Sequence, residues 1–342
     1  MPVLSPRQKA ALVSSLEPGL AASFAEATEA IKGRVSIAAL ASALESGSVD
    51  RVISVLGLES ADQFAAFEEA MRTTFLRAGR RYVSAFPPLD VGETRWDATF
   101  DIRNPRAERF LADHSAGKVR GDLIPRQRAA IRAAVEAGFA DGRNPNSIAL
   151  DLVGRYDRTA RKRVGGLIGL TGTQANYVRN MRKQLASGNP VEMAAYFQRQ
   201  RRDARFDRLV QSAINEGRPV AAADIDRIAA RYQDRLLAMR GEAVARTETR
   251  RAVGAAARES LEQAVEDGAL RRSQIKRIWR SAGADGKTRP SHLDMEGQTV
   301  GLDEPFIFPG GGAAMYPGDD SLDADPAEVI NCRCNVEEEV DW

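Results

Sequence analysis

The chain has 342 residues, of which 43% are hydrophobic and 28% are charged, and its formal net charge is +2. This composition is typical of a globular protein with room for two or three modules, and no apolar run approaches the roughly 20 residues that cross a bilayer. Residues 1–7 lack the apolar core of a signal peptide, and the only two cysteines lie two residues apart. We therefore expect a protein made in a reducing cytoplasm, without a membrane.

Charge is spread unevenly along this nearly neutral chain. Residues 151–220 hold 14 Lys and Arg against 6 acidic residues, whereas residues 303–342 hold 11 acidic residues against a single Arg. Such asymmetry is compatible with a basic surface for nucleic acid or an acidic partner. Solvated helix faces are the simpler explanation.

Residues 1–88 are predicted to form an N-terminal helical module. Phe67, Met71 and Phe75 recur at the spacing of an amphipathic helix. Pro87 and Pro88 then interrupt the helix and stiffen the connection. No residue of this module suggests chemistry.

Residues 89–222 are predicted to form a middle helical region. Asn104 before Pro105 is a helix start, and Thr171 with Gln174 has the form of a capping box. His114, in the last turn of the helix that starts at Pro105, is expected to be a surface residue without function. A further helix from about residue 191 is predicted to carry a band of arginines on its polar side. This basic band consists of Arg199, Arg201, Arg202, Arg205 and Arg208.

Residues 223–342 are predicted to form a small α+β domain, so the expected fold class is mainly α with an α+β C-terminal part. A helical pattern runs from residue 224 to about residue 267. Beyond it the apolar period changes to that of short strands, which we expect to pack on the long helix. The expected strands are residues 275–281, 298–302, 306–308 and 330–340.

The last predicted strand contains both cysteines of the chain. If the run is extended, Ile330, Cys332, Cys334 and Val336 lie on one face. His292 lies 40 residues before Cys332, so the three residues are candidate zinc ligands, with an acid or water as the fourth. The cysteines equally suit two small buried apolar side chains, and on this interpretation no cofactor is expected.

A second chemical alternative assigns catalysis to His292. Asp294 would orient this histidine as a general acid or base, or Arg289 would bind a phosphate, as in a metal-free nuclease. Adjacency in sequence does not create such a geometry. We expect instead that His292 and Arg333 hydrogen-bond the irregular loop onto the last strand, and that the protein is not an enzyme.

An ordered series of short motifs extends over about 95 residues of the C-terminal part. The series begins with Ala245-Arg246-Thr247-Glu248-Thr249 and Ile278-Trp279. It continues with Arg289-x-x-His292, Gly297-Gln298-x-Val300, Glu304-Pro305-Phe306 and Met315-Tyr316-Pro317-Gly318, and it ends with Ile330-Asn331-Cys332-Arg333-Cys334. In this order the series resembles the phage Mu protein F-like family of minor head, or head morphogenesis, proteins. Its members Arg246, Thr247, Glu248, Arg289, Asn331 and Arg333 are expected to be structural.

The resemblance implies a structural component of a tailed phage or prophage virion. Such a protein acts in head assembly near the portal and in DNA packaging or ejection. Its expected partners are the portal protein, the major capsid protein and the packaged double-stranded DNA, which the basic band would contact. The alternative is a metal-bearing or nuclease-like enzyme that uses His292 with Cys332 and Cys334. Since the chain ends eight residues after Cys334, we expect no toxin domain of the kind that some relatives carry there.

Overall fold

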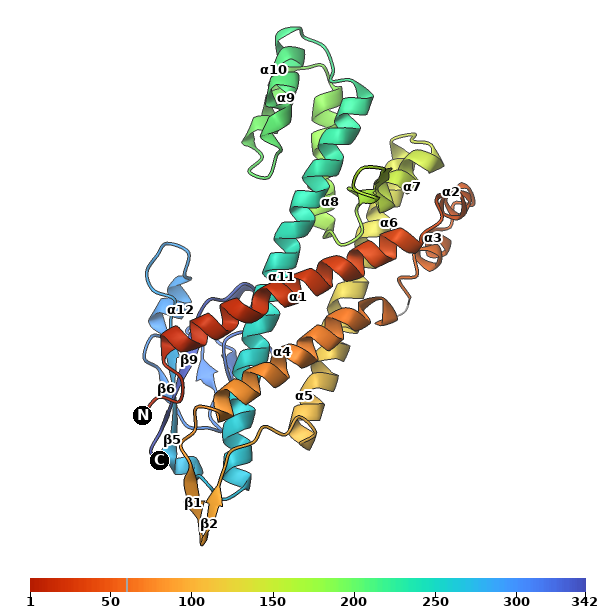
Figure 1. Cartoon of the computed structure of the whole chain (residues 1–342). Coiled ribbons are helices and arrows are strands. Elements are labelled where there is room, and N and C mark those ends of the chain that lie inside the picture. Colours follow the sequence, from red (N-terminus) through yellow and green to blue (C-terminus); the bar gives the residue numbers. More distant parts are fainter. Residues whose placement is uncertain (60) are drawn as a thin grey trace. The chain divides into compact units, whose positions relative to one another are not determined.

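The computed structural model describes residues 1–59 and 61–342 (Figure 1). Packing divides the chain into two compact units, each built from segments far apart in sequence. Unit 1 contains residues 1–23, 67–115 and 242–342, and unit 2 contains residues 24–66 and 116–241. Two long helices, α1 (Pro6–Arg34) and α11 (Ala222–Glu266), contribute residues to both units. The contiguous domains 1–88, 89–222 and 223–342 stay a prediction.

Unit 2 is helical apart from one hairpin. Its helices are α2 (Ile37–Glu45), α3 (Val49–Val55), α6 (Ile124–Ala140), α7 (Pro145–Val153), α8 (Gly172–Ala186), α9 (Pro190–Ala194) and α10 (Asp207–Asn215). The short 3-10 turns η1 (Ala61–Phe64), η3 (Ala195–Gln198) and η4 (Ala204–Phe206) and the π-helix η2 (Ala116–Leu123) connect them. The strand β3 (Arg155–Asp157) pairs with β4 (Lys162–Val164). The capping box predicted at Thr171 and Gln174 is present at the start of α8.

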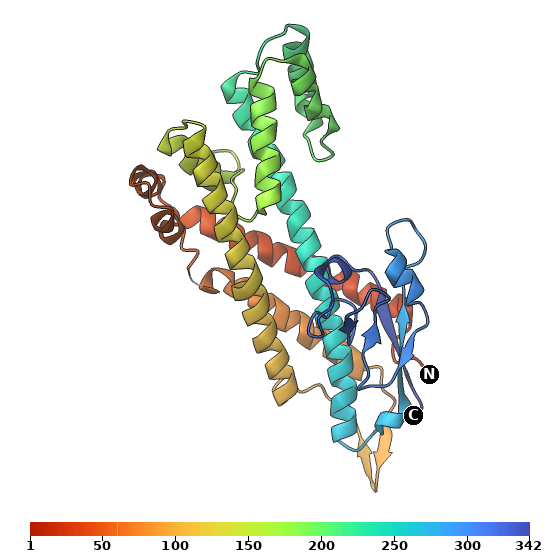
Figure 2. The same cartoon turned by 180° about the vertical axis from the view of Figure 1, so that it is seen from behind.

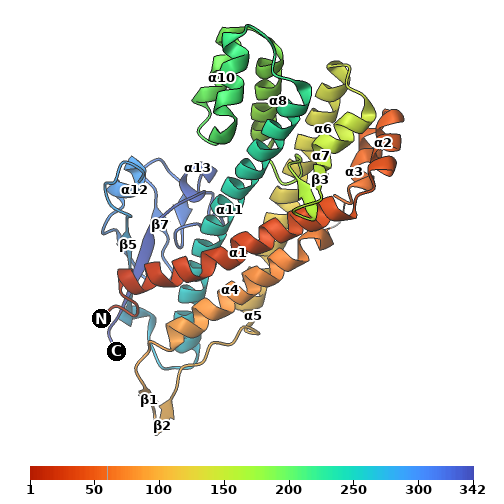
Figure 3. The same cartoon turned by 45° about the horizontal axis from the view of Figure 1, so that its top comes forward.

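The single helix predicted from residue 191 is wrong. The chain forms α9, two 3-10 turns and α10 instead, and α9 and α10 pack against each other (Figure 3). Asp203 explains the break, because its carboxylate accepts a hydrogen bond from the Arg205 main-chain N–H at 3.2 Å and so caps a new turn. Four arginines of the basic band therefore precede α10 rather than lining one helix face.

Unit 1 combines helices with short antiparallel strands, so the predicted fold class is confirmed. Its helices are most of α4 (Ala65–Val83), α5 (Pro105–Ser115), α12 (Pro290–Asp294) and α13 (Pro326–Val329), with the turn η5 (Arg272–Gln274). Its strands are β1 (Leu89–Val91), β2 (Thr94–Trp96), β5 (Ile275–Arg280), β6 (Thr299–Val300), β7 (Phe306–Ile307), β8 (Ala313–Ala314) and β9 (Asn335–Val340). No described helix combines the length and apolarity that crossing a bilayer requires.

The C-terminal sheet has the strand order β6-β5-β9 and lies beside the second half of α11 (Figure 2). Ile275 pairs with Val340 and Arg280 with Asn335 in its longest ladder. The N-terminus covers the other edge of β9, because the Val3 N–H donates to the Glu338 carbonyl at 2.8 Å. This pairing satisfies main-chain groups that an open edge would leave exposed.

One face of the sheet packs on a core of aromatic and sulfur side chains. The fully buried Trp279 lies edge-on to two phenylalanines. Its ring centroid is 5.3 Å from that of Phe306 and 5.9 Å from that of Phe308. Cys332 and Cys334 belong to the same cluster. The sulfur atoms of Cys332 and Cys334 therefore lie in largely apolar surroundings.

Glu338, on the same face of β9 as Val336 of this core, forms a buried ion pair with Lys9 of α1. Lys9 Nζ lies 2.6 Å from Glu338 Oε2, and the two side chains are 4% and 3% exposed. The Tyr82 hydroxyl donates to the same carboxylate at 3.3 Å, and Lys9 also donates to the Val336 carbonyl. Burial lowers the pKa of Lys9, and the Glu338 charge opposes that change.

Candidate metal centre

His292 is held in a short helix at the edge of the aromatic core. Arg289 and Pro290 begin α12, where a proline suits the first helical position. The imidazole is only 1% exposed, and its ring centroid lies 5.7 Å from Trp279 and 5.6 Å from Phe308. These rings fix the imidazole in place and exclude water from it.

The two cysteines lie in a tight turn before β9 rather than in the strand itself. Asn331 has a φ of 62°, a left-handed conformation that interrupts an extended chain. The prediction that Ile330 shares the buried face is therefore wrong, and Ile330 is 42% exposed. Cys332 and Cys334 are each only 2% exposed, because the turn aims both sulfur atoms inward.

Motif residues from distant segments hold this turn. The Thr247 hydroxyl accepts from the Asn331 N–H at 2.9 Å, and Arg246 Nη1 donates to Asn331 Oδ1 at 2.6 Å. Arg289 Nη2 donates to the Ile330 carbonyl at 2.6 Å. The motif Ala245-Arg246-Thr247-Glu248-Thr249 on α11 and the cysteine-containing motif thus form one contact region.

Arg333 fastens the outer side of the turn to the loop before α12. Its two terminal nitrogens each lie 2.7 Å from a carboxylate oxygen of Asp285, and Nη2 also donates to the Thr288 hydroxyl at 3.1 Å. These hydrogen bonds hold the pKa of Asp285 well below its usual range. Arg333 therefore bonds the segment just before β9 to the loop before α12.

The three candidate ligands converge on one point. His292 Nδ1 lies 3.3 Å from Cys334 Sγ and 3.4 Å from Cys332 Sγ, and the ligand atoms of all three residues lie within 4.8 Å of one another. Zinc bonds of about 2.3 Å to sulfur and about 2.0 Å to nitrogen at tetrahedral angles place those atoms about 3.5 Å apart. The arrangement therefore fits a tetrahedral metal with one further position.

The second imidazole nitrogen faces a carboxylate. His292 Nε2 lies 2.8 Å from Glu328 Oε2, although the N–H is not aligned for a hydrogen bond. Ser291 donates to the same oxygen at 2.9 Å. A carboxylate in this position favours the proton on Nε2 and leaves the Nδ1 lone pair for the sulfur side.

The two thiols differ in the direction in which their surroundings shift the pKa. A hydrogen bond from Cys334 lowers the pKa of Cys332, and the nearby charges of Arg250 and Arg289 act in the same direction. The same hydrogen bond, together with burial, raises the pKa of Cys334. Burial opposes the lowering at Cys332 and adds to the raising at Cys334.

We expect the Asn331 turn to tolerate glycine better than alanine. Alanine in the left-handed region costs about 1–2 kcal/mol, and the lost Arg246 contact adds a few tenths. Asn331→Ala should lower the free energy of unfolding by about 1–2 kcal/mol, and Asn331→Gly by less than about 1 kcal/mol. Urea unfolding measures both. Equal losses would show that the backbone conformation does not determine the cost.

His114 is not a surface residue, and the prediction for it is wrong. It is 9% exposed, and its Nε2 lies 3.1 Å from an oxygen of the fully buried Glu248. Arg251 approaches the other imidazole nitrogen at 3.3 Å and pairs with Asp320 at 2.6 Å. Glu248 of the motif therefore connects α11 to α5 within unit 1. No local pattern indicates this contact, because 134 residues separate the partners.

Two of the five arginines of the basic band are neutralised within unit 2, and a third bonds to a neutral amide. Arg202 donates to both oxygens of Asp207 at 3.1 and 3.0 Å, and Arg205 pairs with Asp203 at 2.6 Å. Arg199 donates to Gln184 at 2.7 Å. The remaining two, Arg201 and Arg208, are exposed and have no ion pair among the described residues. Only these two keep a charge fully available to a partner.

Fold and site thus define the class of protein: it is largely helical, with a small antiparallel sheet and a buried His–Cys–Cys cluster. Residues 204–337 match the family model described as Phage Mu protein F like protein, which confirms the resemblance for this segment. The match contains α10, α11, the candidate ligands and most of the C-terminal sheet.

A second comparison found a short match. A stretch of 68 residues is 37% identical to a protein of Bacillus subtilis (strain 168) named "Uncharacterized protein YqbB". The stretch is 19% of this chain and 22% of that relative, so the chain spans about a fifth of the relative's length. No solved structure matches the chain.

Proposed function

We propose that this protein is a minor head protein of a tailed phage or prophage, with a structural role in head assembly near the portal and in DNA packaging or ejection. The observation that carries the proposal is the match of residues 204–337 to the Mu protein F-like family. Packing within the matched segment supports it, because the motif residues Arg246, Thr247 and Asn331 bind one another. Contacts of this kind hold a structural scaffold together.

The nuclease-like alternative finds little support in the geometry. His292 is 1% exposed and both of its nitrogens face protein groups. A general acid or base must reach a substrate atom within hydrogen-bond distance, directly or through one water. The buried His292 imidazole therefore contributes to the packing of the fold rather than to a reaction on a nucleic acid.

Affinity purification tests the head role. The tagged chain would be isolated from cells that produce its phage, and the eluate would be read by mass spectrometry. Portal and major capsid proteins are expected in the eluate. Nuclease activity in an eluate without either protein would favour the enzymatic alternative.

We further propose that His292, Cys332 and Cys334 bind a structural zinc ion. The convergence of three buried ligand atoms favours metal over simple apolar packing, since packing alone does not require an imidazole nitrogen between two sulfurs. When bound, zinc would connect α12 to the turn before β9 and stabilise this loop-rich part of unit 1. These residues hold the loop and exclude water, and no reaction is assigned to them.

Weak DNA binding through the basic band is the third element of the proposal. Each phosphate contact contributes about −0.9 to the slope of log K against log salt, so losing two should reduce the slope by about 2. We expect this change in Arg201→Glu/Arg208→Glu, measured by fluorescence anisotropy on duplexes of two unrelated sequences. Arg7→Glu/Arg109→Glu, which reverses two exposed arginines of unit 1, is the charge-matched control. An unchanged slope in the first variant would remove DNA as the partner of the band.

A further inference from the structure

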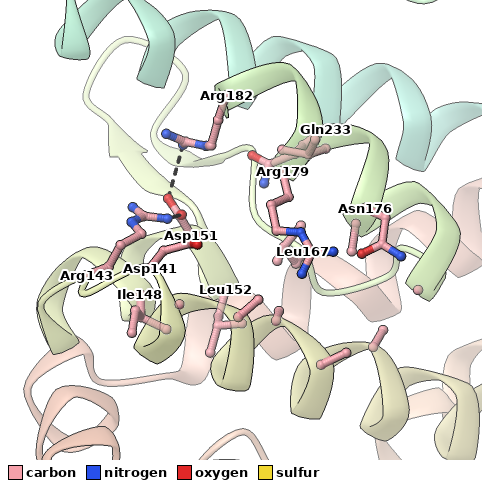
Figure 4. A pocket seen from close by; sticks show the side chains of 18 residues that line it. Asp141, Arg143, Ile148, Asp151, Leu152, Leu167, Asn176, Arg179, Arg182 and Gln233 are labelled. Atoms are coloured by element: carbon pink, nitrogen blue, oxygen red, sulfur yellow. Dashed lines mark hydrogen bonds and ion pairs between the residues drawn. The ribbon is translucent and has the colours of Figure 1, made fainter. Parts of the chain in front are cut away.

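Unit 2 contains a pocket between α6, α7 and α8 that none of the motifs involves (Figure 4). Its cavity volume is about 60 Å³, several times the space that one water needs. Every lining residue belongs to unit 2, and the first half of α11 contributes Gln233. The pocket is therefore a feature of one compact body.

Small residues of α6 make the pocket floor. They are Ala130, Ala133, Ala134, Ala137 and Gly138, which recur on one helix face. A Cβ at Gly138 would lie 2.9 Å from Ile148 Cδ1, so glycine is what allows α7 to pack closely at this end. Leu152, Leu167 and Val178 add apolar walls. The floor is smooth and apolar because no side chain is long enough to fill it.

The acidic residues that line the pocket already have partners. Asp151 pairs with Arg143 and lies 3.1 Å from Arg182 Nη2, and Asp141 lies 2.9 Å from Lys183. Arg182 also pairs with Asp226 at 2.6 Å. The carboxylates at this site are thus satisfied within the protein.

The basic residues of the lining, by contrast, include nitrogen atoms without a hydrogen-bond or ion-pair partner among the described residues. Arg179, one helical turn before Arg182 on α8, has no ion pair or hydrogen bond within the described part of the chain, and its guanidinium extends over the pocket toward α6 (Figure 4). Arg182 Nε is buried and also lacks a hydrogen-bond partner there. With three arginines against two aspartates, the lining has a net positive charge. The pocket thus presents an apolar floor beneath unused guanidinium donors.

We propose that this pocket is a docking site for a partner protein, which inserts a short aliphatic side chain against α6 and places a neighbouring carboxylate on Arg179. The volume suits a branched side chain, and Arg binds carboxylates through paired N–H donors. A nucleic-acid backbone carries no apolar group to cover the alanine floor. The proposal rests on the pocket alone and is independent of the head role.

The test uses dipeptides with the full-length protein and ligand-observed NMR. Acetyl-Asp-Leu-amide is expected to bind at least about tenfold more tightly than acetyl-Asn-Leu-amide, because only the former has a carboxylate for Arg179. Arg179→Gln should remove this difference, whereas Arg158→Gln, which changes an exposed arginine in the β3–β4 turn, should keep it. Ala134→Leu should abolish binding of both peptides by filling the floor. Leucine is a good helix former, so thermal unfolding should show this variant folded.

Three results would overturn the proposal. The first is binding of neither dipeptide, and the second is equal affinities in the wild-type protein. The third is displacement of the bound dipeptide by a short DNA duplex, which would make the pocket part of a nucleic-acid surface. If neither dipeptide binds, binding of free 4-methylpentanoate would show that the pocket accepts a small carboxylic acid and no peptide.

Discussion

Lys9→Met is expected to lower the free energy of unfolding by about 3–5 kcal/mol, the largest effect of any single substitution considered. Lys9 and Glu338 are both almost completely buried, and the lysine is the cation that pairs with this carboxylate. Without it, the Glu338 charge stays in the core with one hydrogen bond from Tyr82. A buried charge without its counterion costs far more than the pair contributes.

Urea unfolding of a small set of variants measures this effect. Lys9→Met/Glu338→Leu should recover more than half of the lost stability, because it removes the charge that Lys9→Met leaves behind. Arg7→Met, an exposed change on the same helix, is the control and should cost less than about 0.5 kcal/mol. A loss below about 1 kcal/mol in Lys9→Met, or no recovery in the double variant, would contradict the burial of this pair.

Purified protein is expected to contain one zinc ion per chain, and chelation is expected to destabilise it strongly. A ligand present at about 1,000 times its Kd adds about 4 kcal/mol to the folded state. Removing zinc should therefore lower the free energy of unfolding by several kcal/mol. Cys332→Ser and His292→Ala should each lose most of the metal, because either change leaves only two protein ligands.

Elemental analysis together with thermal unfolding separates this account from apolar packing. If the cysteines only fill the core, zinc is absent, chelators have no effect, and Cys332→Ala costs about 1 kcal/mol. Thiol reagents do not distinguish the two accounts, because both cysteines are buried in either case. Absence of zinc from protein purified without chelators would therefore reject the metal centre.

Local signals predicted the long helix α11, the start of α8 and much of the C-terminal sheet, but not the break between α9 and α10. The long periodic pattern from residue 224 corresponds to α11, and the capping box at Thr171 starts α8. The strand predicted at residues 275–281 corresponds to β5. These features depend on apolar period and on contacts within a few residues, which a sequence displays directly.

Features that depend on one backbone angle or on distant partners were missed. The left-handed Asn331 moves the start of β9 to residue 335, and an asparagine in an alternating pattern does not reveal its φ. Asp203 and Asp207 neutralise two arginines that appear free in sequence. Glu338 is buried, although two glutamates flank it, because it pairs with Lys9. Each of these outcomes is decided by tertiary contacts.

The candidate ligand set could be assembled from sequence, but its geometry could not. His292, Cys332 and Cys334 were singled out by residue type and scarcity, and the structure places their ligand atoms within 4.8 Å. The supporting residues Glu328 and Arg250 gave no signal, because neither belongs to a motif. Only the fold shows that one faces the imidazole and that the other lies near the thiols.

Quantitative mass spectrometry of purified phage heads tests the central claim most directly. Heads would be isolated from a lysate of cells that produce the phage encoding this chain, and washed in high salt to remove adsorbed proteins. The account predicts that the chain remains with the heads in a constant ratio to the portal protein. Its absence from washed heads that contain portal and major capsid proteins would contradict a structural role in the head.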